Sequence, residues 1–124
     1  AERRILRLSC AGHPPPLFVR HGQDVLPMRV DSVPALLLAE LGNVPCAELQ
    51  LQSGDRMLLY TDGITDRQAA DETMFDGDRL MSALDQARSL DLPAVVQSLV
   101  ADLDAFAGSH EPHDDQTLLL IGIT

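Results

Sequence analysis

Residues 57–65, MLLYTDGIT, decide the fold of this chain. Apolar and aromatic residues run directly into the corner Thr61-Asp62-Gly63, which predicts a buried strand that ends by turning the Asp62 carboxylate out of the sheet edge. Far downstream, Asp114-Asp115 precedes a second apolar run, residues 118–123. We predict that the two strands lie side by side and bring Asp62 and Asp114 to one end of a sheet, where they would hold a divalent metal.

Each of the two acidic motifs also has a simpler interpretation. A Thr-Asp-Gly sequence after a strand is often an ordinary turn, and Asp-Asp-x-Thr is often a polar start to a strand. The metal-site prediction therefore depends on the two strands being neighbours.

Composition limits the class of protein. A length of 124 residues is that of one domain, and 45% hydrophobic with 23% charged residues is typical of a globular protein. The net charge of −10 disfavours nucleic acid and anionic lipid as partners. No apolar run approaches the roughly 20 residues of a membrane helix, and no signal-like segment is present, so we predict a cytoplasmic location with no membrane contact by this segment.

The two cysteines, Cys10 and Cys46, are widely separated and form no Cys-x-x-Cys motif. This spacing argues against a disulfide framework or a zinc ribbon. We predict two small buried thiols in a reducing compartment, with a single disulfide as the alternative.

The order of elements predicts an α+β fold, because strands come first, two consecutive helices follow and one strand ends the chain. Residues 35–38 are predicted to form one helical turn or a buried loop, and the polar residues after Asp62-Gly63 are predicted to form a surface loop. Two hairpins are expected, one joining 17–19 to 25–30 and one joining 47–51 to the strand that starts at 57. Predicted strands cover residues 5–8, 17–19, 25–30, 47–51, 57–60 and 118–123.

Both predicted helices begin at an aspartate. Asp76 is expected to cap a helix that runs to about Arg88, and Asp91 to cap a second one that has Pro93 in its first turn and ends at Gly108. Apolar residues at steps of three and four predict one core-facing stripe on each helix. The stripes are Leu80, Ala83, Leu84 and Ala87 on the first helix, and Val96, Leu99, Leu103 and Phe106 on the second.

Four motifs occur in the order found in metal-dependent protein phosphatases. They are residues 11–17 (AGHPPPL), residues 54–66 (GDRMLLYTDGITD), Phe75 with Arg79-Leu80, and residues 114–119 (DDQTLL). Over nearly its whole length the chain resembles the SpoIIE-like branch of this family, the bacterial relatives of type-2C phosphatases.

This resemblance implies part of an α-β-β-α sandwich, with antiparallel sheets, a two-helix layer and a binuclear Mn²⁺ or Mg²⁺ site at one end of the sheets. The family's metal ligands fall on Asp62 and Asp114, and a hydrogen-bonding role falls on Asp115. Gly63 belongs to the same motif as Asp62. We interpret Thr61 and Thr117, which flank the two aspartates, as residues that orient the ligands, with plain strand propensity as the alternative. The implied reaction is attack of a metal-activated water on a serine or threonine phosphoprotein, in this branch an anti-sigma-factor antagonist. An upstream sensor or receiver domain is also implied.

The chain departs from the family in one respect. A further aspartate, followed by glycine and bridging both metals, is expected on a strand in the N-terminal half, and no such stretch precedes Ala11. Asp76-Gly77-Asp78 lacks an apolar strand ahead of it. We therefore expect residues 1–124 to be the C-terminal part of a larger domain whose N-terminal part is absent, inactive by itself and with a sheet edge open to a homodimer.

Several alternatives remain open at this stage. The chain is either a phosphatase fragment, a catalytically inactive phosphatase-like module that binds proteins, or a binder of a structural cation such as Ca²⁺. His110-x-x-His113 is interpreted as a solvated pair, with a transition-metal site as the alternative, and His13 as a turn residue.

Overall fold

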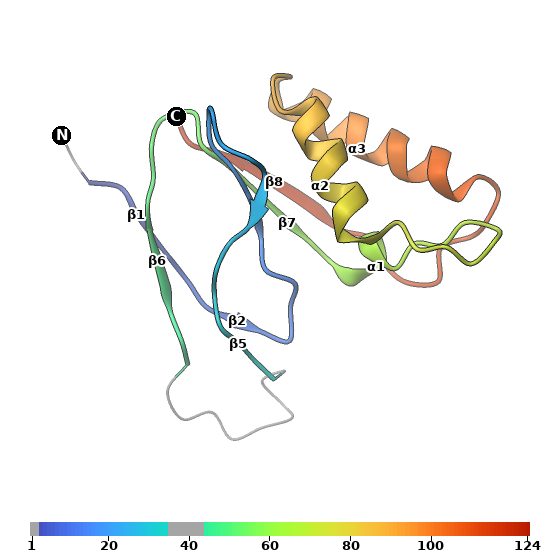
Figure 1. Ribbon diagram of the computed structural model, residues 1–124, viewed down its shortest axis with the longest axis horizontal. Coiled ribbons are helices and arrows are strands. Elements are labelled where there is room, and N and C mark those ends of the chain that lie inside the picture. Colours follow the sequence, from blue (N-terminus) through green and yellow to red (C-terminus); the bar gives the residue numbers. More distant parts are fainter. Residues whose placement is uncertain (1–2, 35–43) are drawn as a thin grey trace.

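The computed structural model describes residues 3–34 and 44–124, so the predicted turn or loop at 35–38 lies outside the described residues. The predicted strands and the two predicted helices occur in the predicted order, and two short strands and one short helix are found in addition (Figure 1). They are β1 (Ile5–Leu8), β2 (Cys10–Ala11), β3 (Leu17–Val19), β4 (Leu26–Pro27), β5 (Ser32–Val33), β6 (Ala47–Gln50), β7 (Arg56–Tyr60), α1 (Asp62–Thr65), α2 (Asp76–Ala87), α3 (Leu92–Ala107) and β8 (Leu118–Gly122).

The main sheet has four antiparallel strands in the order β4-β3-β7-β8. β7 and β8 pair along their whole length, from Arg56 opposite Gly122 to Tyr60 opposite Leu118. The prediction that these two strands lie side by side is therefore confirmed. Helices α2 and α3 cover one face of this sheet, which confirms the predicted α+β class (Figure 1).

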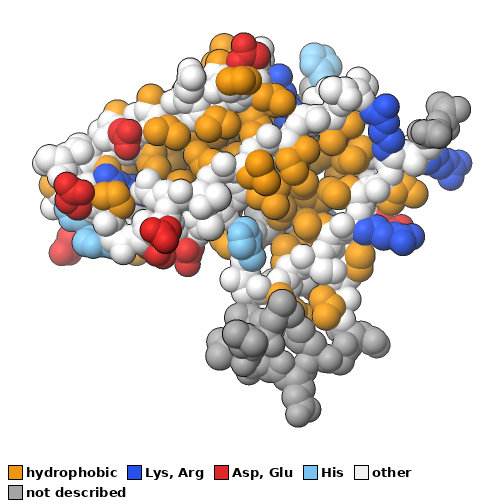
Figure 2. Space-filling model, turned by 180° about the vertical axis from the view of Figure 1, so that it is seen from behind, with side chains coloured by type: hydrophobic (Ala, Val, Ile, Leu, Met, Phe, Trp, Pro, Cys, Tyr) orange, Lys and Arg blue, Asp and Glu red, His pale blue; other side chains and the backbone are white. Residues whose placement is uncertain are grey.

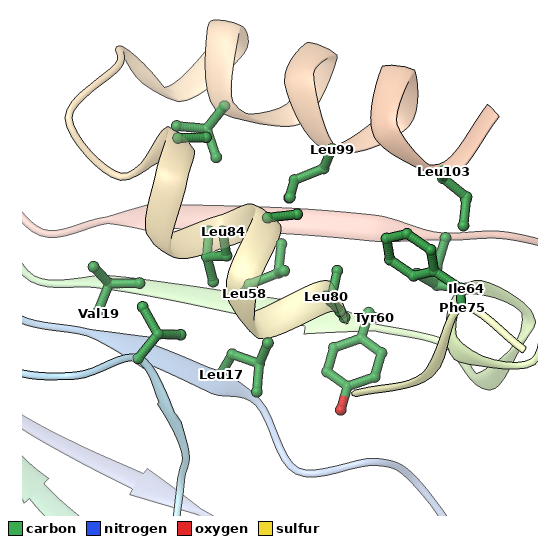
Figure 3. Close-up of a cluster of buried hydrophobic side chains, with 14 residues drawn as sticks. Leu17, Val19, Leu58, Tyr60, Ile64, Phe75, Leu80, Leu84, Leu99 and Leu103 are labelled. Carbon is green, nitrogen blue, oxygen red and sulfur yellow. The ribbon is translucent and has the colours of Figure 1, made fainter. Parts of the chain in front are cut away.

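The hydrophobic core fills the space between the sheet and the two helices (Figure 3). Successive strand residues point to opposite faces, so alternate residues of β3 and β7 reach the helices. Leu17, Val19, Leu58 and Tyr60 supply the sheet side, and Leu80, Leu84, Leu99 and Leu103 supply the helix side. Burial raises the pKa of the Tyr60 hydroxyl in this layer.

The helices largely match the expected pattern. Asp76 Oδ1 accepts the Arg79 amide at 2.9 Å, Asp91 Oδ1 accepts the Ala94 amide at 2.9 Å, and Gly108 ends α3. All four predicted core residues of α2 are buried. On α3 the prediction was wrong at Val96, because the buried row is Val95, Leu99, Leu103 and Ala107, one residue every four, and Val96 lies about 100° further around the helix.

Strand pairing agrees with the prediction at one of the two hairpins and differs at the other. The first hairpin is confirmed, although only Leu26–Pro27 of residues 25–30 forms a strand beside β3. The second hairpin was wrong, because β6 pairs with β1 and not with β7. The chain between β6 and β7 carries Asp55, whose buried carboxylate bonds Arg20, just after β3, and the Gln52 amide. The two-residue strands β2 and β5 pair in parallel.

Both cysteines are free, but only Cys10 is buried. The prediction of a buried thiol was wrong for Cys46, which is exposed just before β6. Among the described neighbours of Cys46, Val44 is exposed and Pro45 and Ala47 are only half-buried, so local composition was misleading.

The sheet face turned away from the helices carries exposed apolar groups. Leu118 and Leu120 pack against the helix-side core, so Leu119 faces the other way and is 53% exposed. Figure 2 shows hydrophobic side chains gathered across the middle of the molecule in the reverse view. An apolar second face is expected of a sheet that forms an inner layer of a sandwich. No helix in the described part of the chain is long and apolar enough to cross a membrane.

We expect the fold to be strongly destabilised when one partner of the Arg20–Asp55 ion pair is removed. Asp55 is 2% exposed and accepts two bonds from Arg20, at 2.8 and 2.5 Å, and one from the Gln52 amide at 2.7 Å. Replacing Asp55 by Asn leaves a largely buried guanidinium without its counter-charge, and should lower the free energy of unfolding by about 3 kcal/mol in urea denaturation. Asp85→Asn is the control, because the Asp85 carboxylate is exposed, and loss of its pair with Arg88 should lower the free energy of unfolding by less than about 1 kcal/mol.

The same pair should make stability sensitive to acid. Burial by itself would raise the pKa of Asp55, but the bonds from Arg20 and Gln52 and the guanidinium charge outweigh it and hold that pKa below its ordinary value. The stabilising effect of the ionised Asp55 carboxylate is therefore fully present above about pH 4, where aspartate is also ionised in the unfolded chain. It is lost as the pH falls through the pKa of Asp55 in the folded protein. Urea unfolding at pH 7 and pH 3 should show a smaller acid loss in Asp55→Asn than in the wild type.

Candidate metal centre

The candidate site lies where β7 ends beside the start of β8. Beyond the last strand pair, the Thr61 amide donates to the Thr117 carbonyl at 3.2 Å, which extends the ladder by one step. The chain then forms the short helix α1, since the Asp66 amide donates to the Asp62 carbonyl at 2.8 Å, and the predicted loop follows α1 at residues 66–75. Asp62 is therefore the first residue of a short helix at the end of the sheet.

The Thr61 side chain ties the two acidic segments together. Its hydroxyl accepts the Thr117 amide at 3.0 Å and donates to the Asp115 carbonyl at 3.3 Å. Because one side chain bonds two backbone groups of the facing segment, Thr61 fixes the backbone that carries the acidic doublet relative to Asp62. Its predicted supporting role in metal binding stays a prediction.

Gly63 is in direct contact with the acidic doublet. A methyl group in place of its hydrogen would overlap the carbonyl oxygen of Asp115 and lie 2.9 Å from the carbonyl carbon. Gln116 Nε2 also donates to the Gly63 carbonyl at 3.3 Å. The absence of a side chain at Gly63 therefore allows the close approach of Asp62-Gly63 to Asp114-Asp115 that the sequence predicted.

The three carboxylates at this end, Asp62, Asp114 and Asp115, are exposed. Asp114 Oδ1 accepts the Asp115 amide at 2.8 Å, and Asp114 and Asp115 both line an open pocket of about 410 Å³. Their oxygens suit Mg²⁺ or Mn²⁺. Within residues 3–34 and 44–124, however, no group of three or more His, Cys, Asp or Glu is arranged to hold a metal. The assignment of Asp62 and Asp114 as metal ligands stays a prediction.

The histidines contribute no metal group in the described part of the chain. His110 and His113 stack edge to face with ring centroids 5.0 Å apart. His13 is exposed, and its Nδ1 lies 2.8 Å from the Pro14 carbonyl oxygen, which fits the predicted turn.

Two residues of this region were missed from the sequence. Gln116 was passed over, although its position between the doublet and Thr117 places it against the end of β7. Arg67 was assigned to a polar loop, yet it is only 8% exposed and its Nη2 donates to the His110 carbonyl at 2.6 Å. No sequence periodicity marks Arg67, because its burial depends on a segment 43 residues away.

The sequence profile of the family described as Stage II sporulation protein E (SpoIIE) matches residues 1–124. The chain belongs to the SpoIIE family. A search of curated proteins gives no match for this SpoIIE-family chain.

Solved structures with the same fold include phosphatase domains. The SiaA-PP2C domain of Pseudomonas aeruginosa is 26% identical, with a TM-score of 0.79 over 98% of this chain and 48% of that one. The PP2C phosphatase domain with a regulatory fragment of SpoIIE from Bacillus subtilis is 18% identical, with a TM-score of 0.72 over 96% and 34%. The RsbU and RsbW domains of Rv1364c from Mycobacterium tuberculosis are 26% identical, with a TM-score of 0.65 over 95% and 33%.

The SpoIIE-family chain described here therefore spans about half or less of the chains that it matches. Its fold is that of part of a PP2C phosphatase domain. The expected family membership is thereby confirmed.

We expect Gly63→Ala to separate the two acidic segments. The added methyl group meets backbone atoms of Asp115, which cannot rotate away as a side chain would, so the free energy of unfolding should fall by about 1–3 kcal/mol. Gly77→Ala is the matched control, because Gly77 lies in the first turn of α2 with nothing within 4 Å of a new methyl group. That variant should be neutral or slightly stabilising in the same denaturation experiment.

Proposed function

We propose that the full-length protein is a Mn²⁺- or Mg²⁺-dependent serine/threonine phosphoprotein phosphatase that acts in bacterial signalling in the cytoplasm. The observation that carries this proposal is the contact of Asp62-Gly63 with Asp114-Asp115 at one end of the sheet, in a chain of the SpoIIE family. The fold shared with the SiaA-PP2C domain supports it. A Bacillus subtilis SpoIIE phosphatase domain presoaked with Mn supports the choice of metal.

Asp62 and Asp114 are the residues that would hold the metal. When bound, such an ion lowers the pKa of water and offsets the charge on phosphoryl oxygens. Thr61 and Gln116 would keep the two carboxylate-bearing segments in place through their bonds to the Asp115 and Gly63 carbonyls. Further ligands, from residues beyond those described, would complete a two-metal site.

The openness of the site favours a protein substrate. Asp62, Asp114 and Asp115 are all exposed, and the adjoining pocket is lined by residues 112–116 of a single loop. A phosphoserine or phosphothreonine on the surface of another protein can approach such a site, whereas a small molecule would find few walls to bind it. We propose an anti-sigma-factor antagonist as the substrate class.

A regulatory domain in the same polypeptide is also proposed. The Bacillus subtilis structure includes a fragment of a regulatory domain, and the Mycobacterium tuberculosis structure contains an RsbW domain beside RsbU. By analogy, we propose that a sensor or receiver domain precedes the phosphatase domain in the full-length protein.

The decisive experiment measures phosphate release by the full-length protein as a function of Mn²⁺. Two substrates are compared, a phosphoserine-containing anti-sigma-factor antagonist and p-nitrophenyl phosphate, which needs no protein recognition. Asp62→Asn and Asp114→Asn should each lower kcat/KM at least about 100-fold, because each removes a proposed metal ligand. Asp78→Asn, in the first turn of α2, is the acidic control and should retain activity. Equal rates in wild type and Asp62→Asn would overturn the proposal.

One observation favours a second candidate, a phosphatase-like module that binds proteins without catalysis. Three carboxylates are exposed here, yet they do not form a metal-holding group in the described part of the chain. The same assay separates the two functions, since a binding module would release no phosphate at any Mn²⁺ concentration. Calorimetry with Ca²⁺ and Mn²⁺ on wild type and Asp114→Ala tests the remaining alternative, a structural cation site. If tight Ca²⁺ binding survives the substitution, the Ca²⁺ site does not include Asp114.

A further inference from the structure

Arg67 is a buried cation placed beside the candidate site. It follows α1 by two residues and is only 8% exposed. Its Nη2 donates to the His110 carbonyl at 2.6 Å, while its Nε and Nη1 are buried without a hydrogen-bond partner among the described residues. A buried guanidinium is costly unless it is well paired. The position of Arg67 is therefore not explained by a local gain in stability.

The backbone of Arg67 is held firmly by the core. Its carbonyl accepts the Phe75 amide at 2.8 Å, and Phe75 is buried and packs edge to face on Phe106 of α3 with ring centroids 5.4 Å apart. The Arg67 amide also approaches the Ile64 carbonyl of α1 at 3.4 Å. A side chain anchored in this way can fix a loop that has no regular structure of its own.

That loop is the segment that carries the acidic doublet. It leaves α3 at Gly108, and every residue from 111 to 117 is exposed. Arg67 holds its start through the His110 carbonyl, and Thr61 holds its end through the Asp115 carbonyl. Four residues, 111–114, lie between the two anchors, and one of them is Pro112. A short segment tied at both ends has few conformations.

We propose that Arg67 is a positioning residue: its guanidinium fixes the start of the 109–116 loop so that Asp114 stays beside Asp62. The consequence for metal binding rests on the proposed function, but the consequence for the loop does not. Groups that hydrogen-bond metal-ligating side chains directly typically change metal affinity by about 10- to 100-fold when they are replaced. Arg67 bonds the backbone at His110 and not Asp114 itself, so we expect an effect at the lower end of that range.

Arg88 provides a matched control in the same chain. Its guanidinium also bonds backbone carbonyls of a distant loop, Arg20 at 2.5 Å and Gln23 at 2.8 Å. It ties α2 to the loop after β3, which belongs to the hairpin and not to the acidic loop. Loss of either guanidinium removes a tether of similar chemistry, but only Arg67 should affect the candidate site.

The first test measures amide hydrogen exchange in the full-length protein without metal. Arg67→Met keeps the apolar stem and removes the donors. It should speed exchange of the Thr117 amide, which donates to the Thr61 hydroxyl, by about tenfold. Arg88→Met should leave Thr117 unchanged and speed exchange of the Gln23 amide, which bonds the Arg20 carbonyl. Unchanged Thr117 exchange in Arg67→Met, or an equal effect in both variants, would overturn the proposal.

The second test measures Mn²⁺ affinity by calorimetry on the same proteins. Arg67→Met should weaken binding by about tenfold and Arg88→Met should not. If wild type binds no Mn²⁺ but Arg67→Met alone speeds Thr117 exchange, then the proposed metal-dependent function fails while the positioning role stands. If wild type binds Mn²⁺ and Arg67→Met binds it equally well, the positioning role is overturned while the proposed function stands.

Discussion

The close approach of Gly63 to the backbone of Asp115 is the constraint on which the candidate site depends. It exists only because β7 and β8 pair in one register, with Tyr60 opposite Leu118. A shift of one residue would turn Leu118 and Leu120 away from the helix-side core, because side chains alternate between the two faces of a strand. The hydrophobic pattern that builds the core therefore also places the acidic doublet beside Asp62.

The opposite end of the same strand pair is fixed as well. Backbone bonds of 2.8 Å join the Gly54 amide to the Ile123 carbonyl and the Ile123 amide to the Asp55 carbonyl. Asp55 is in turn held by Arg20 next to β3. The β7–β8 pair is thus anchored at one end by a buried ion pair and at the other by the Thr61 hydroxyl. Because both ends of the strand pair are fixed, the distance between the two acidic segments depends on the whole sheet and not only on contacts at the site.

The features that could be predicted from the sequence are those that local pattern determines. Caps at Asp76 and Asp91, the α2 stripe and the apolar strands around the acidic motifs all depend on neighbours within a few positions. The partner of β6 could not be predicted, since an alternating strand fits equally well beside β1 or β7 and the choice depends on contacts between segments far apart in the sequence. Arg67 was missed for a similar reason, because only the folded chain brings it to His110.

The carboxylates of the candidate site are not paired with arginine side chains in the described part of the chain. The ion pairs found among the described residues are Arg7–Glu48, Arg20–Asp55, Arg79–Asp76 and Arg88–Asp85. None of them uses Asp62, Asp114 or Asp115, and Arg67 bonds a carbonyl oxygen and not a carboxylate. A carboxylate already paired with arginine would have to give up that partner before it could bind a metal, which would weaken the site. By bonding the backbone of His110, Arg67 can hold the loop without neutralising the carboxylates that the loop carries.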